Sequence, residues 1–403
     1  MNGILAIEKP SGIASTKFLD KLQNVLTFSE VFENDLKAMK DLKKKQLMTD
    51  TKWSQQKIDT RVKNLKIKMG HGGTLDPLAS GILIVGIGSG TKKLQHYLTG
   101  CNKTYETKAL LGISTTTGDS EGEILTKNSV DHITKDQIEE TVEKFVGDIK
   151  QTPPIFSALK MNGKPLYDYA REGKPLPRAI KARDVKVYDI KVFSEDSLSL
   201  EHGFEKLVSQ LDDNGKPKEH QLANNPTLND SPLFFSSQYL EKIGLSQEEV
   251  PKIDTHIFSS EDSADPLPPI LPLLHLTADV SSGTYIRSLV SDFGRALGSS
   301  AYMVELIRVK QSNWELGKNV FKMEDFTERD PRIWGPILMK VFKDGDSVNL
   351  EEEFRNFTEK LGPLFEKEAE GKEETAEDDK KGQEEGEAVA TAVPSKRSIE
   401  DVE

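Results

Sequence analysis

The stretch GHGGTLDPLASG, residues 70–81, decides how this chain of 403 residues is interpreted. It holds four glycines and one carboxylate, Asp76, which stands between a leucine and a proline. Pro77 fixes its own φ angle and pushes Asp76 toward an extended conformation. The glycines permit left-handed φ angles and close approach of another backbone. Taken alone, Asp76 is either the cap of a tight turn or a positioned carboxylate that acts as nucleophile or base.

Motifs of other common active sites are missing. GSGTKK at 88–93 lacks the glycine that a phosphate-binding loop places before its lysine, and neither HExxH nor GxSxG occurs. The only cysteine, Cys101, excludes a disulfide within the chain and a cysteine-based zinc site. No run approaches the roughly 18 apolar residues of a membrane span. We therefore expect a protein of a reducing, intracellular compartment.

The charge is distributed unevenly. The whole chain carries −12, but residues 37–68 hold eleven Lys or Arg against three acids, a local balance of +8. Residues 366–403 hold fourteen acids against six bases, so without this tail the net charge is only −4. The basic segment is either a solvated charged helix or a surface that faces phosphates, and both interpretations stay open at this point.

Hydrophobic periodicity predicts a mixed sequence of strands and helices, and hence an α+β fold around an antiparallel or mixed sheet. Strands are predicted at 3–8, 65–70, 81–88, 103–112, 185–192, 274–280 and within 305–316. Helices are predicted from a cap at Ser15 or Thr16 to about Leu26, over 134–147 with Thr134 as cap, and from about Tyr285 to Leu297. The polar stretch 202–268 is interpreted as a partly disordered surface insertion.

Further glycine-anchored stretches carry a resemblance that extends over most of residues 3–310. They are NGILAIEKPSG (2–12), KTY (103–105), GISTTTGDSEG (112–122), PPIFSALK (153–160), LYDYAREG (166–173) and GTYIRSLVSDFG (283–294). In this order, together with GHGGTLDPLASG, they resemble the TruB family of tRNA pseudouridine synthases, in a stand-alone, fungal-type eukaryotic form. The resemblance implies the pseudouridine synthase fold and an isomerase that converts uridine 55 of the TΨC loop to pseudouridine without a metal or an organic cofactor.

The resemblance also implies roles for three residues. Asp76 matches the catalytic nucleophile, which acts through a covalent sugar adduct or a glycal-like route, and the sequence leaves both routes open. Arg287 matches the arginine that pairs with this aspartate and keeps it ionised. Tyr105 matches the tyrosine that stacks on the flipped base and is a candidate for proton abstraction at C5. From the residues alone, Arg287 is also compatible with a surface arginine at a helix start.

Five more positions match the family's pattern. Tyr285 and Leu306 fall on base-pocket positions, and His71 falls on the histidine that fills the space left by the extruded nucleotide. As simpler alternatives, Leu306 is an ordinary core leucine and His71 a structural hydrogen-bonding group. Lys9 and Pro10 belong to a motif that we expect to buttress the catalytic loop.

The expected organisation is a catalytic domain over 1–312, a small region over 313–365 and a disordered acidic tail over 366–403. The catalytic domain carries a basic insertion at about 30–64 and a polar one at about 202–268. The family usually ends in an RNA-binding PUA module, which we expect to be reduced or absent here. We hypothesise that the basic segment 37–68 contacts the tRNA elbow and partly substitutes for that module.

The partners implied are the TΨC arm of tRNA and other RNAs with a similar stem-loop, for a monomer with no membrane and no obligatory protein partner. We expect it in the nucleus and the mitochondrion. Two alternatives remain. One is the catalytic subunit of guide-RNA-dependent box H/ACA particles, which shares GTLDP and YIR. The other is an RNA chaperone on the same fold, although such a protein has no need of Asp76 and Arg287.

Overall fold

A nine-stranded mixed sheet forms the centre of the computed structural model, which describes residues 1–50, 52–209, 225–250 and 267–365. The strand order is β1-β3-β12-β4-β11-β10-β7, with β2 paired to β3 and β13 paired to β12. The strands are β1 Gly3–Lys9, β2 Met69–His71, β3 Ser80–Ile87, β4 Lys103–Leu111, β7 Gly147–Gln151, β10 Arg183–Val192, β11 Leu273–Val280, β12 Ala301–Gln311 and β13 Trp314–Glu315. The α+β fold class is therefore confirmed.

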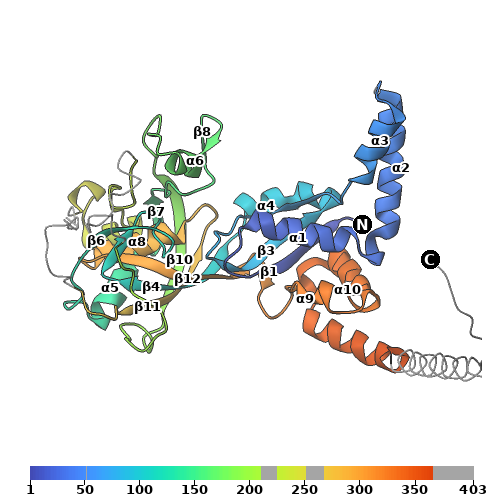
Figure 1. Ribbon diagram of the computed structural model, residues 1–403. Helices are drawn as coiled ribbons and strands as arrows, with labels where there is room; N and C mark the ends of the chain where they lie inside the picture. The colour runs from blue at the N-terminus through green and yellow to red at the C-terminus, as the bar shows by residue number, and fades with distance from the viewer. Residues whose placement is uncertain (51, 210–224, 251–266, 366–403) are drawn as a thin grey trace, which may run out of the picture.

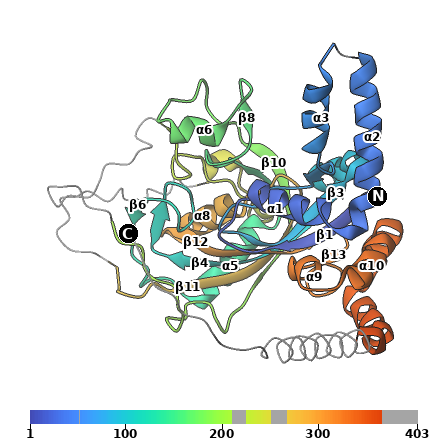
Figure 2. The same cartoon turned by 45° about the vertical axis from the view of Figure 1, so that its right-hand side comes forward.

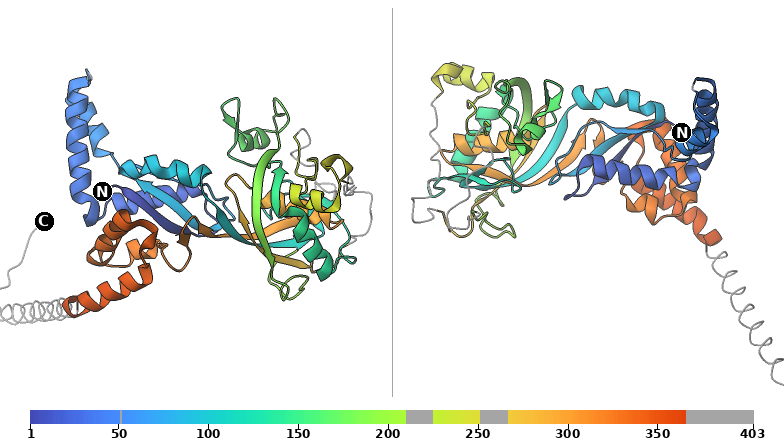
Figure 3. Two further views of the ribbon diagram at one scale, coloured as in Figure 1. Left: turned by 180° about the vertical axis from the view of Figure 1, so that it is seen from behind. Right: turned by 45° about the horizontal axis from the view of Figure 1, so that its top comes forward.

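Helices cover both halves of this sheet (Figures 1 and 3). The α-helices are α1 Ser15–Thr27, α2 Glu33–Asp50, α3 Gln55–Lys63, α4 Leu94–Thr99, α5 Lys135–Phe145, α6 Leu166–Arg171, α7 Ser237–Ile243, α8 Ile286–Ala296, α9 Glu324–Thr327 and α10 Pro331–Asp344. Short strands pair outside the main sheet, β5 Ile113–Thr115 with β6 Ile124–Lys127 and β8 Lys160–Met161 with β9 Lys164–Pro165. The 3₁₀ segments are η1 Glu30–Phe32, η2 Gly88–Lys93, η3 Gln247–Glu249 and η4 Gly345–Ser347.

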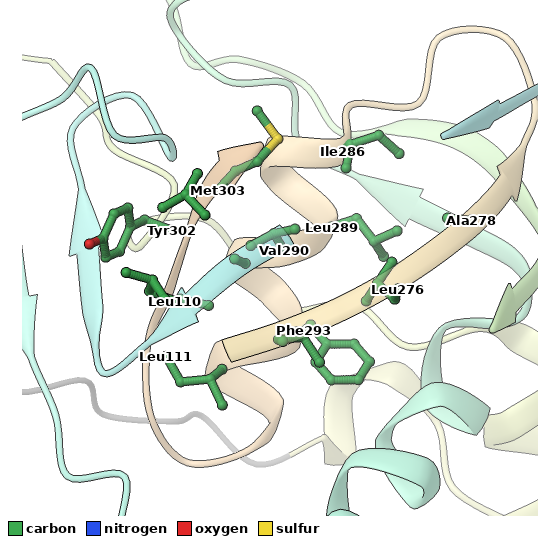
Figure 4. Close-up of a cluster of buried hydrophobic side chains, with 14 of the residues drawn as sticks. Leu110, Leu111, Leu276, Ala278, Ile286, Leu289, Val290, Phe293, Tyr302 and Met303 are labelled. Atoms are coloured by element: carbon green, nitrogen blue, oxygen red, sulfur yellow. The ribbon is translucent and has the colours of Figure 1, made fainter. Parts of the chain in front are cut away.

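The sheet carries two hydrophobic cores, one on each half. In the first, α8 packs on β4 and β12, and α5 packs on β10 and α8. Figure 4 shows Leu289 and Phe293 of α8 directed toward Leu276 on β11, with Leu110 of β4 beside them. In the second, α1 and α10 pack on β1 and β3, and residues from the 313–365 region such as Trp334 belong to this core. Residues 313–365 are therefore held by the strands that begin the chain.

The two halves join where β3 meets β12, which is the parallel pairing of the sheet. Ile307 lies opposite Ser80 and Arg308 opposite Gly81. Gly81 has φ +96°, and a Cβ at this position would lie 2.4 Å from the carbonyl oxygen of Arg308. A side chain at residue 81 would push the two halves apart, so the last glycine of GHGGTLDPLASG is required by backbone packing.

Two predictions from local pattern were wrong, for related reasons. Residues 65–68 form no strand, and β2 begins at Met69. The Ile67 backbone is bound instead by α1 side chains, because Gln23 Nε2 donates to its carbonyl at 2.8 Å and its amide donates to the Thr27 hydroxyl at 3.3 Å. Ser15 does not cap α1, whose N-cap is Ala14. In both cases a long-range hydrogen bond uses a polar group that the local pattern had assigned to a strand or to a helix cap.

The other periodic segments formed close to the predicted bounds. The predicted cap of α5 is present as a capping box, in which the Thr134 hydroxyl accepts from the Gln137 amide and the Gln137 side chain accepts from the Thr134 amide. The predicted helix near Tyr285 is α8, with Tyr285 at the N-cap. The last predicted strand begins earlier than expected, at Ala301, because β12 pairs with β4 along almost its whole length.

The two expected insertions differ in how they meet the body. Residues 33–63 form the helical hairpin α2–α3, which projects from the β1–β3 half (Figures 1 and 2). The described part of the polar insertion packs on the body, because the Asn229 amide donates to the Ser114 hydroxyl at 2.7 Å and the Ser236 amide donates to the Lys144 carbonyl at 2.8 Å. The expected acidic tail lies outside the described residues.

Gly81→Ala tests the join between the two halves. We expect it to lower the free energy of unfolding by about 3 kcal/mol or more, because it adds a backbone clash to the strain of a left-handed conformation. Gly317→Ala is the matched control, since Gly317 has φ +77° with no atom within 4 Å of the added Cβ. It should cost only about 1 kcal/mol. Equal losses of stability in urea denaturation would contradict the clash.

Candidate active site

The loop that carries Asp76 connects β2 to β3 and is fixed by the segment that follows β1. The Gly12 amide donates to the Pro77 carbonyl at 2.8 Å. The Ser15 hydroxyl donates to the Leu75 carbonyl at 2.8 Å and accepts from the Leu75 amide at 2.9 Å. These bonds hold the backbone on both sides of Asp76, and they explain why Ser15 is unavailable as a helix cap.

Lys9 supports the same loop from inside the protein. Its side chain is fully buried, and its ammonium donates to the carbonyls of Pro10 at 2.8 Å, Ile13 at 2.7 Å and Pro77 at 3.4 Å. Burial lowers the pKa of Lys9 from 10.5 to about 8, and the Asp76 carboxylate opposes this shift. The buttress expected from the IEKPSG motif is thus a buried cation bonded to three carbonyls.

Arg287 binds Asp76 directly. Arg287 Nε lies 2.9 Å from Asp76 Oδ2, and its two terminal nitrogens donate to the carbonyls of Thr117 at 2.8 Å and Phe156 at 2.7 Å. The guanidinium is buried, whereas the Asp76 side chain keeps 36% of its surface exposed. The fixed cation therefore aims a carboxylate that a substrate can still reach.

A second carboxylate on the same guanidinium was missed by the sequence analysis. Asp119 Oδ2 lies 3.6 Å from Arg287 Nε, and its other oxygen accepts from the Thr117 hydroxyl at 2.5 Å and the Glu121 amide at 3.1 Å. Burial and the charges of Asp119 and Asp76 raise the pKa of Glu121. The motif GISTTTGDSEG contained both acids, but no local pattern shows that this loop folds against α8.

Tyr105 and Leu306 come from neighbouring strands. Tyr105 on β4 and Leu306 on β12 are both buried members of the first core. Arg308, which the sequence analysis did not single out, donates from Nη1 to the Tyr105 hydroxyl at 3.4 Å. Its Nε and Nη2 donate to the carbonyls of Ile82 at 2.7 Å and Gly73 at 3.0 Å. One arginine therefore links Tyr105, the Asp76 loop and the start of β3.

Tyr285 and His71 lie near the ends of elements that border the same loop. The Tyr285 backbone exchanges two hydrogen bonds with the Gln151 side chain, at 2.8 and 3.1 Å. Burial raises the pKa of the Tyr285 phenol. Burial and then the charge of Arg308 lower the pKa of His71, whose Nδ1 has no hydrogen-bond partner among the described residues.

The structure thus brings four of the six sequence-predicted site residues to one loop. Asp76 and Arg287 are in contact, Tyr105 is tied to the loop through Arg308, and His71 ends the strand that leads into it. Within the described part of the chain, no three His, Cys, Asp or Glu side chains are grouped to hold a metal ion. Over those same ranges, none of the helices combines the length and the hydropathy needed to cross a bilayer.

Comparison with known proteins gives a consistent family. The model for the N-terminal domain of TruB family pseudouridylate synthases matches residues 60–206. The chain is 51% identical over 361 residues to tRNA pseudouridine synthase 4 of Saccharomyces cerevisiae, covering 88% of each chain. It is 36% identical to tRNA pseudouridine synthase 4 of Schizosaccharomyces pombe, covering 85% of this chain and 86% of that one. It is 34% identical to tRNA pseudouridine synthase B of Ralstonia pickettii, covering 72% and 68%.

Lys9→Met tests the buried ammonium through the pH dependence of stability. The pKa of Lys9 is about 8 in the folded chain and 10.5 when exposed, so the unfolded chain binds more protons between these values. Stability contributed by Lys9 must therefore rise as pH increases from about 8 to 10.5. In denaturation at each pH, the wild type should gain stability relative to Lys9→Met across this window. The exposed Lys17, changed to Met, should show no such trend, and a flat difference for Lys9→Met would contradict the lowered pKa.

Proposed function

We propose that this chain, which belongs to the TruB family of pseudouridylate synthases, isomerises uridine 55 in the TΨC loop of tRNA without a guide RNA. As a pseudouridine synthase, it is an isomerase. The observation that carries the proposal is the contact of Asp76 with Arg287, because it presents one accessible carboxylate held by a buried cation. The names of the yeast and bacterial relatives support tRNA as the substrate class.

In the proposed reaction, the bond between N1 of uracil and C1′ of the ribose breaks, the base rotates, and a bond forms between C5 and C1′. The proton on C5 is then lost and N1 takes one up, so atoms and electrons balance without a redox partner. Asp76 assists at C1′, either as nucleophile or by a glycal-like route. Arg287 pairs with this carboxylate and holds it in position for attack at C1′.

The uridine must leave its stack to reach Asp76, which costs a few kcal/mol. We propose that Tyr105 offsets part of this unstacking cost, because its ring would stack on the extruded base. Tyr285 and Leu306 would form walls of the base pocket. We propose that His71 fills the space that the extruded nucleotide leaves in the RNA. Its lowered pKa favours the neutral imidazole, which suits a group inserted among bases better than one that binds phosphates.

The Tyr105 hydroxyl is the candidate for the proton at C5. It is the one polar atom of the proposed stacking residue, and Arg308 fixes its position with a hydrogen bond at 3.4 Å. The same arginine holds the Gly73 carbonyl, so the hydroxyl and the Asp76 loop are held by one group. We therefore propose that base rotation brings C5 to Tyr105 while C1′ stays beside Asp76.

Asp76→Asn should abolish pseudouridine formation, with a loss on the order of 10⁴ or more, because it removes the nucleophile. RNA affinity should stay within about twofold, since the amide keeps the shape of the carboxylate. The assay is site-resolved pseudouridine mapping on a guide-free tRNA transcript carrying uridine 55. Asp20→Asn, on the exposed side of α1, is the matched control and should keep full activity. Persistent modification by Asp76→Asn would remove it from the mechanism.

Tyr105→Phe separates stacking from proton transfer. The ring remains, so affinity should hold, while the single-turnover rate should fall by about 10² to 10⁴ because general-base assistance is lost. Tyr105→Leu should in addition weaken RNA binding by about 1 to 3 kcal/mol, the range for loss of one base–aromatic stack. A Tyr105→Phe enzyme with the wild-type rate would assign the C5 proton to another group.

A further inference from the structure

The helical hairpin of residues 33–63, called the arm below, is built as an independent projection. Its two helices, α2 and α3, pack on each other through a small core of Leu47, Ile58 and Val62, with Leu65 at its edge. Figures 1 and 2 show the arm rising from the β1–β3 half, on the same side of the sheet as the hairpin that carries α6 and β8. The apolar core of the arm is separate from the two large cores of the sheet. The exposed surface of the arm is therefore available to bind a partner.

The arm keeps a net positive charge when its ion pairs are taken into account. Residues 33–63 hold nine cations and five acids. Two of the acids are already bound, Asp59 by Lys44 at 2.7 Å and Asp35 by the terminal amine of Met1. Most of the cations are exposed: Lys37, Lys45, Lys52, Lys57, Arg61 and Lys63. This density of exposed positive charge is complementary to a phosphate backbone.

The arm also lies at a defined distance from the catalytic loop. Ser15, the first residue of α1, is bonded to Leu75 on the loop, and the chain enters the arm soon after α1 ends at Thr27. The 13 residues of α1 span about 20 Å at 1.5 Å per residue. That is somewhat more than half a turn of a nucleic-acid duplex, whose full turn is about 34 Å in DNA. An RNA duplex that extends from a uridine at Asp76 toward the arm would reach it after about 20 Å.

We propose that the arm binds the sugar–phosphate backbone of the RNA duplex beyond the substrate loop, about 20 Å from Asp76. This inference rests on the proposed function, since it takes the RNA substrate as the partner. The contacts are electrostatic and independent of sequence. Lys57 lies 4.3 Å from the centre of the Trp53 ring, so the tip of the arm holds at least one ammonium in a fixed position. The arm thereby adds affinity for long substrates without touching the reacting uridine.

The test removes three exposed charges along α2 and the tip, as Lys37→Gln, Lys45→Gln and Lys52→Gln in one chain. None of the three belongs to the Lys44–Asp59 pair or to the arm's core, so the arm should stay folded, with an unchanged melting temperature. Two RNAs are compared: a full tRNA transcript with uridine 55, and a minimal stem-loop whose duplex is too short to cover the α1 span. Kd is measured by titration over a series of salt concentrations.

For the full transcript, Kd should rise about tenfold or more at low salt. The slope of log Kd against log salt should fall by about 2 to 3, close to one for each phosphate that is no longer neutralised. For the minimal stem-loop, Kd should change less than about twofold, and the single-turnover rate at saturating enzyme should not change. The matched control keeps the charge, as Lys37→Arg, Lys45→Arg and Lys52→Arg, and should bind like the wild type.

Three outcomes would overturn the proposal. An unchanged Kd and slope on the full transcript would show that the arm does not bind RNA. An equal weakening on both RNAs would place the interaction inside the catalytic cleft. Failure of the arginine control would show that the lysines act through something other than their charge. If the wild type binds the transcript but forms no pseudouridine, the proposed function fails, while the binding series still reports on the arm.

Discussion

The buried guanidinium of Arg287 is the interaction on which the site depends. A cation removed from water must be compensated, and here two carbonyls and the Asp76 carboxylate do so, with Asp119 at 3.6 Å. Those partners come from three loops that are far apart in the sequence. Binding of one guanidinium therefore brings the three loops together. The shape of the site follows from compensation of this charge rather than from packing of apolar side chains.

Local sequence pattern was sufficient to predict a strand or a helix where the surrounding structure supports the same element. The alternation in β4 and the capping residues of α5 agree with the fold because burial and hydrogen bonding act in the same direction there. The pattern failed at Ile67 and Ser15, where one distant hydrogen bond outweighs a weak local preference. The family motifs indicated the loops that form the site, which periodicity did not, because these motifs mark the short stretches that come together there.

Asp119 and Arg308 mark the limit of such reasoning. Each is one polar residue in a stretch that the pattern assigns to ordinary loop or strand, and its importance arises from groups about 170 and 200 residues away. Arg308 illustrates this best, since its backbone carbonyl requires a glycine at 81 and its side chain holds both Gly73 and Tyr105. No window of sequence contains these partners, so only the assembled sheet reveals that one residue both joins the halves and orders the site.

The pKa of the buried Lys9 and the pKa of the more exposed Glu121 shift in opposite directions. Burial lowers the pKa of Lys9 and raises that of Glu121, so each is drawn toward its neutral form. An RNA phosphate brought near them would act against the first shift and with the second, since negative charge stabilises a protonated lysine and a protonated glutamate alike. The entry of an RNA phosphate near this loop is therefore expected to raise the pKa of both groups.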